Sequence, residues 1–188
     1  MARYTAQVTS AAALADDTAF AWLMGTANGG GLLRRVILGV RHTTAATAVT
    51  DFQCKVGINR VTSAGTTPTG GTENSNLTRQ GTARMEFDTA FATPPTQGAE
   101  ATDFFTIPFN AKSGVDIPAE FLEEFEIAKL ATDGFAFVNR SGALPASHVF
   151  EVFIEVTVVD APALAWRADC AAGPALVPTV AVCRTATC

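Results

Sequence analysis

The feature that most constrains this chain is a run of alternating apolar and polar side chains toward its C-terminal end. From Phe150 to Val158 every second residue is apolar, and Glu151, Glu155 and Thr157 lie between these positions. Successive side chains of a β-strand point to opposite faces of a sheet, whereas a helix repeats every 3.6 residues. The run therefore predicts a strand with one face in a core and the other toward water.

The same period of two recurs through most of the chain. The clearest further cases are 52–58 and 83–91, and shorter candidates are 4–8 as an edge strand, 19–24, 104–109 and 135–138. Residues 32–40 are apolar on both faces except at Arg34 and Arg35, which predicts a central strand covered on both sides over part of its length.

Two segments are less regular. Residues 124–130 fit a helix that begins after Pro118 or a strand, and the β-rich neighbours favour the strand. Residues 62–81 contain glycine, proline and asparagine without an apolar period, so we expect a long exposed loop there.

Eight or nine short strands without a convincing helix predict an all-β sandwich or barrel. About eight strands in about 160 residues fit a jelly roll. An immunoglobulin-type sandwich fits less well, because it needs only about 100 residues and a Cys/Trp/Cys core pattern that this chain lacks. We therefore expect a jelly-roll β-sandwich domain in residues 1–160 and an extended C-terminal arm in residues 161–188.

The composition changes at the start of this arm. Pro162, Pro174 and Pro178 disfavour a helix, yet the segment is too apolar to remain solvated. We expect it to contact a protein surface, either its own sandwich or, as the favoured alternative, a neighbouring subunit. The candidate contact residues are Trp166, Leu176, Val177, Val180, Cys183 and Cys188.

Charge and composition exclude some classes of partner. Charged residues make up 16% of the chain and the formal net charge is -5, with no basic cluster longer than Arg34-Arg35. A nucleic-acid partner is therefore not expected. No apolar run approaches the roughly 20 residues of a membrane span, and Asp16 and Asp17 interrupt any export signal.

The inventory of reactive side chains is small. Cys54 lies in a strand pattern and is expected to be a buried free thiol. Cys170, Cys183 and Cys188 match no common zinc spacing; they could form a late disulfide, but free thiols are favoured in a reducing cytosol.

No catalytic, cofactor or metal residues are predicted. His42 and His148 are expected to make ordinary hydrogen bonds at strand ends, and Asp16, Asp17 and Asp51 do not form a calcium loop. Glu151 and Glu155 share a strand face and are the best candidates for a glycosidase pair. With only Trp22, Trp166 and Tyr4 to line a glycan cleft, a solvated strand face is favoured, so we expect that the protein is not an enzyme.

Several short stretches resemble small virion-associated proteins of tailed phages. They are residues 2–6, 43–48, 59–66, 137–139 and 143–146, and together they span about residues 2 to 155. They are patterns of strand ends and turns. The resemblance implies a jelly-roll fold and a place on the particle surface.

The function that the resemblance implies is capsid decoration. A decoration or cement protein stabilises the phage head by contacts with the major capsid protein or other virion proteins, and such proteins are often homotrimers. The protein would act on the virion after assembly in the host cytoplasm. The alternatives are a tail or fibre component and a carbohydrate-binding β-sandwich module.

Overall fold

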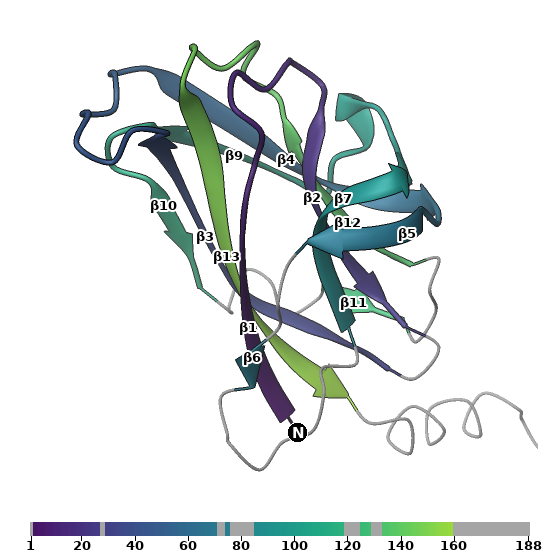
Figure 1. Ribbon diagram of the computed structural model, residues 1–188. Coiled ribbons are helices and arrows are strands. Elements are labelled where there is room, and N and C mark those ends of the chain that lie inside the picture. Colours follow the sequence, from purple (N-terminus) through teal and green to yellow (C-terminus); the bar gives the residue numbers. More distant parts are fainter. Residues whose placement is uncertain are drawn as a thin grey trace, which may run out of the picture.

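The computed structural model describes residues 2–26, 29–70, 74–75, 85–118, 125–128 and 133–159. Within these ranges it contains β-strands and one short 3-10 turn, η1 (Glu100–Thr102). The strands form two antiparallel sheets that face each other as a β-sandwich (Figure 1). The predicted all-β sandwich is therefore confirmed. The predicted arm, with its candidate contact residues, lies outside the described residues.

The first sheet is built around the longest strands. Its order is β10 (Val115–Ile117), β3 (Gly30–His42), β13 (His148–Val159), β1 (Ala2–Thr9) and β6 (Asn74–Ser75), with β11 (Glu126–Ile127) also paired to β3. Strand β13 pairs along its length with β3 on one side and with β1 on the other. Strand β3 has β13 on one edge and β10 and β11 on the other, so the central strand predicted at 32–40 is confirmed. Its burial alternates from Leu33 to Leu38, so the predicted cover on both faces is not seen there.

The second sheet has seven strands. Its order is β5 (Thr66–Gly70), β7 (Met85–Thr93), β2 (Ala19–Gly25), β12 (Gly134–Asn139), β4 (Gln53–Ser63) and β8 (Thr96–Gln97), with β9 (Phe105–Asn110) also paired to β4. Strands β5 to β8 all fall between β4 and β9 in the chain.

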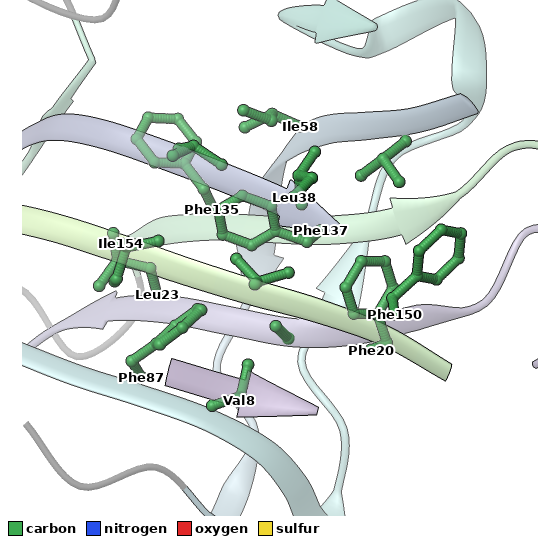
Figure 2. Packing of buried hydrophobic residues seen from close by; sticks show 14 of the residues in the cluster. Val8, Phe20, Leu23, Leu38, Ile58, Phe87, Phe135, Phe137, Phe150 and Ile154 are labelled. Carbon is green, nitrogen blue, oxygen red and sulfur yellow. The ribbon is translucent and has the colours of Figure 1, made fainter. Parts of the chain in front are cut away.

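The main core lies between the two sheets. Phe87, Phe137 and Phe150 are fully buried there, and they come from strands of both sheets. Phe20 stacks on Phe150 with ring centroids 4.9 Å apart, and Figure 2 shows these side chains pointing into the shared interior. Each buried apolar side chain of this size contributes about 1.5–3 kcal/mol, so the alternating pattern accounts for the sandwich.

A second, smaller core covers the other face of the second sheet. It contains Trp22, Met24, Val61, Ala136 and Val138, and the half-buried Ala19 and Phe91 pack against it. Every residue of β12 is buried, because that strand has a core on each face.

Strand β7 contributes to both cores. Phe87 lies in the main core, whereas Phe91 packs edge-on against Trp22 with ring centroids 5.1 Å apart. Residues four apart share a face in a regular strand. The pairing of β7 with β5 shifts register between Asp88 and Ala90, and such an extra residue moves the side chains that follow to the other face. The period of two at 83–91 predicts that Phe87 and Phe91 face one core, and this prediction is therefore wrong.

The other differences concern short strands. The loop expected at 62–81 is wrong in part, because β4 continues to Ser63 and β5 and β6 lie within that range. The strand at 4–8 is confirmed, but it is not an outermost strand, since β6 pairs with Tyr4 and Thr5. The strand preferred for 124–130 is confirmed at Glu126–Ile127.

Candidate functional site

The described surface has one conspicuous apolar feature. Phe104 and Phe105 are the large apolar side chains that stay exposed among the described residues, with 51% and 37% of their surfaces accessible. They are neighbours at the start of β9, which borders the second sheet. Adjacent exposed aromatic side chains are typical of a contact surface.

Phe104 belongs to a group of three aromatic rings. Its ring centroid lies 6.0 Å from that of Phe125 and 5.6 Å from that of Phe135, and the latter two are 5.5 Å apart. Phe125 immediately precedes β11 of the first sheet, whereas Phe135 is at the start of β12 of the second. The three rings therefore connect the two sheets at one open side of the sandwich.

A cleft of about 240 Å³ continues this surface. It lies between β9 and β10, which belong to opposite sheets, and we call it the β9/β10 cleft. Its lining residues are Phe105, Thr106, Ile107, Pro108, Val115, Asp116, Ile117 and Pro118. Most of these side chains are apolar, so the cleft suits an apolar side chain.

The charged residue in the lining is already paired. Arg35 donates two hydrogen bonds to Asp116, with Nε to Oδ1 at 2.9 Å and Nη2 to Oδ2 at 2.5 Å. This hydrogen bonding lowers the pKa of Asp116 below its ordinary value. The carboxylate is thus compensated and does not make the cleft a cation site.

A proline lies in or directly after each strand that borders the cleft. Pro108 lies within β9 opposite Lys55 of β4, and Pro118 directly follows β10. Proline lacks the N–H that a sheet ladder requires, so in a sheet it is tolerated where its nitrogen faces the open side of an edge strand. A strand added to β9 at the cleft would lack a donor at Pro108.

A buried ion pair holds the residue that precedes Phe104. Arg140 Nε donates to Asp103 Oδ2 at 3.0 Å and Arg140 Nη2 donates to Asp103 Oδ1 at 2.8 Å. Arg140 also donates from Nη1 to Asp17 Oδ1 at 2.8 Å. The hydrogen bond with Asp103 is the main cause that raises the pKa of Arg140, so the guanidinium stays charged.

Asn59 of β4 completes this network. Its Nδ2 donates to Asp103 Oδ1 at 2.6 Å, and its Oδ1 accepts the N–H of Gly98 at 2.7 Å. Gly57 leaves the space for the Asp103 carboxylate, because a Cβ there would lie 2.1 Å from Asp103 Oδ2. The network therefore fixes residues 98–103 on β4 and positions the exposed aromatic pair that follows.

The two histidines are neighbours but have structural partners. They face each other across β3 and β13, with ring centroids 5.3 Å apart. His148 Nε2 accepts the N–H of Thr50 at 3.2 Å, and His42 Nδ1 accepts the N–H of Thr44 at 3.0 Å. The expected ordinary hydrogen bonds are confirmed, and they hold both ends of the loop between β3 and β4.

The acidic side chains considered as candidates also have partners within the molecule. Glu151 pairs with Arg41 and Glu155 pairs with Arg3, so neither carboxylate is free. Asp16 accepts the N–H of Gly142 at 3.0 Å. Within the described ranges no group of three or more His, Cys, Asp or Glu side chains could hold a metal ion.

Cys54 is buried, with 2% of its surface accessible, so the prediction of a buried free thiol is confirmed. Burial raises the pKa of this thiol to about 12. Among the residues that the structure describes, no helix is long and apolar enough to span a membrane.

The six predicted contact residues of the arm cannot be placed, since all lie outside the described residues. The surface around Phe104 and Phe105 was missed, although two consecutive phenylalanines beside Pro108 in a short strand are a usable signal. No protein-family model, no curated protein and no solved structure was found to match this chain.

Proposed function

We propose that this protein is a jelly-roll structural protein of a tailed-phage particle, and that it stabilises the head as a capsid decoration protein. The observation that carries the proposal is the pattern of strand pairing. The resemblance of residues 2–155 to small virion proteins supplies the functional class, since a fold alone does not specify one.

The jelly roll is supported by four strand pairs. Eight strands in chain order, β1, β2, β3, β4, β9, β10, β12 and β13, form the framework. The first pairs with the eighth, the second with the seventh, the third with the sixth and the fourth with the fifth. One long antiparallel hairpin rolled into two sheets has this pairing, and jelly rolls are typical of viral capsid domains.

Asn139, one of the residues that carry the resemblance, has a role in building this fold. Asn139, from the stretch 137–139, donates from Nδ2 to the carbonyl oxygens of Leu14, Ala15 and Gly142 at 3.3, 3.0 and 2.7 Å. It thereby joins the end of β12 to the loop between β1 and β2. This agrees with a resemblance in architecture, which suits a structural protein.

The surface chemistry supports contact with other proteins. The charged side chains Arg140, Asp103, Arg35 and Asp116 are paired within the molecule, whereas the large apolar side chains of Phe104 and Phe105 are exposed. Such a surface gains free energy when another protein covers it. We propose the major capsid protein or another virion protein as partner, with a homotrimer as the bound form.

Reconstruction of the phage particle that carries this protein tests the proposal. The expected result is density for the sandwich on the outside of the capsid, in groups of three at local threefold positions. Density in the tail or fibre would support the alternative location and contradict decoration. Absence from the particle, together with retention on a glycan array, would overturn the structural role in favour of a carbohydrate-binding module.

A further inference from the structure

We infer that the β9/β10 cleft is the docking site of the C-terminal segment, residues 161–188. This goes beyond the proposed function, and it does not depend on where in a particle the protein is placed. The inference rests on three properties: the chemistry of the cleft, the composition of the segment and the distance between them.

The cleft offers apolar side chains that have no cover among the described residues. Phe105 and Pro108 are exposed at its rim, and Ile107 and Ile117 form its buried floor. Its volume of about 240 Å³ is below the range of about 300–1,000 Å³ that is usual for small-molecule sites. The size suits one or two apolar side chains of a peptide better than a free ligand.

The segment has the complementary composition. Its apolar residues include Leu164, Trp166, Leu176, Val177, Val180 and Val182. Its charged side chains are limited to Arg167, Asp169 and Arg184. Arg35 already compensates Asp116, the carboxylate in the cleft lining. The cleft therefore suits an apolar segment with few charges, because neither the cleft nor the segment then has to bury an unpaired charge.

The segment is also long enough. Val159 pairs with Gly30 at one end of β3, and Ile117 of β10 pairs with Val36, six residues further along β3. Six residues of strand and two strand spacings separate the two points by about 22 Å. The stretch from Val159 to Trp166 spans up to about 23 Å when extended, so Trp166 and all later residues can reach the cleft.

The edge prolines specify how the segment binds. Addition of a strand requires continuous backbone donors, and Pro108 interrupts them on β9. Docking must therefore rely on side chains that enter the cleft from an extended segment. The three prolines of the segment favour such an extended backbone.

Cysteine cross-linking in the full-length chain tests the inference. The Thr106→Cys variant places a thiol in the cleft lining, and Cys170, Cys183 and Cys188 supply partners in the segment. The native Cys54 thiol is buried and does not compete. After mild oxidation, peptide mass spectrometry should find a disulfide between the introduced thiol and the segment.

The matched control is Gln7→Cys, which places a thiol at an exposed position of β1, away from the residues that line the cleft. We expect at least fivefold more cross-linked product with Thr106→Cys than with Gln7→Cys. Mixing isotopically light and heavy copies shows whether the segment comes from the same chain or from a neighbouring copy, and docking is supported in either case.

Fluorescence of Trp166 gives an independent readout. The chain has two tryptophans, so Trp22→Phe leaves Trp166 as the sole emitter. Its emission should be that of a buried indole and should shift to longer wavelength when Phe105→Ser is added, while circular dichroism reports an intact sandwich. Equal cross-linking in both cysteine variants, with solvent-like emission before the Phe105 change, would overturn the inference. If the protein still decorates the capsid in that case, the proposed function stands without it.

Discussion

Arg140 and Asp103 form a two-point ion pair in which the two side chains are only 2% and 1% exposed. Arg140 follows β12 and Asp103 follows η1, so the pair joins two segments that are 37 residues apart in the chain. Replacing both members of such a pair with apolar side chains is often harmless, whereas removing one leaves an uncompensated charge. The value of this pair is that it fixes the backbone that leads into Phe104 and Phe105.

The first prediction is that Arg140→Met lowers the free energy of unfolding by about 3–5 kcal/mol, because it leaves the Asp103 carboxylate buried without its cation. Urea denaturation followed by circular dichroism measures this. Arg41→Met is the control, since its partner Glu151 is partly exposed, and it should cost about 0–1 kcal/mol. Adding Asp103→Asn to Arg140→Met should restore part of the loss; a double variant less stable than the single one would contradict this account.

A second prediction uses two glycines of long strands. Gly57→Ala should destabilise the protein by at least about 1–3 kcal/mol, because the new methyl group collides with the Asp103 carboxylate. Gly39→Ala should be neutral or slightly stabilising, since nothing lies within 4 Å of its Cβ position. Thermal unfolding of the Gly57→Ala and Gly39→Ala variants tests this prediction. Equal melting temperatures of the two variants would show that the space at Gly57 is not required.

The long strands could be predicted from the sequence because their signal is local. The alternation from Phe150 to Val158 follows directly from which side chains enter the core, and this strand is where the pattern indicates. Short strands such as β8 and β10 have two or three residues, too few to establish a period. Their existence depends on partners far away in the chain, which no local pattern contains.

The polar network could not be predicted for a related reason. Asn59, Asp103 and Arg140 are separated by dozens of residues, and the pairing of β4 with both β12 and β9 brings them together. The second core could not be predicted from the sequence either. Phe91 continues the alternation of Phe87, yet it packs on the opposite face of the second sheet. The register shift of β7 that separates them depends on its pairing with β5, which the period-two pattern does not contain.

The third prediction concerns this second core. Phe91→Ala removes the edge-on contact with Trp22 and should loosen the β5–β7 pair locally, by about 1–3 kcal/mol. Hydrogen exchange should accelerate in β5 and in the second half of β7 but not in β13. Phe87→Ala is the contrast, because its fully buried ring belongs to the main core and its loss should accelerate exchange throughout. Uniform acceleration with Phe91→Ala would show that the two cores unfold as one.

The last prediction concerns pH and Cys54. Burial raises the pKa of its thiol from 9.0 to about 12, so the folded protein binds this proton more tightly than the unfolded chain. The stability that follows from this difference is fully present below about pH 9 and is lost as the pH rises toward about 12. The loss is at most about 1.4 kcal/mol for each pH unit in that window.

Cys54→Val removes the titrating group and keeps a small apolar side chain in the core. In a background where Cys170, Cys183 and Cys188 are serine, the parent should lose more stability than Cys54→Val between pH 8.5 and 10.5, about 2 kcal/mol more at the upper end. Urea denaturation at a series of pH values measures the two slopes, and other groups that titrate there cancel in the comparison. Parallel slopes would mean that the thiol ionises as readily in the folded protein as in the unfolded chain, which contradicts its burial in the main core.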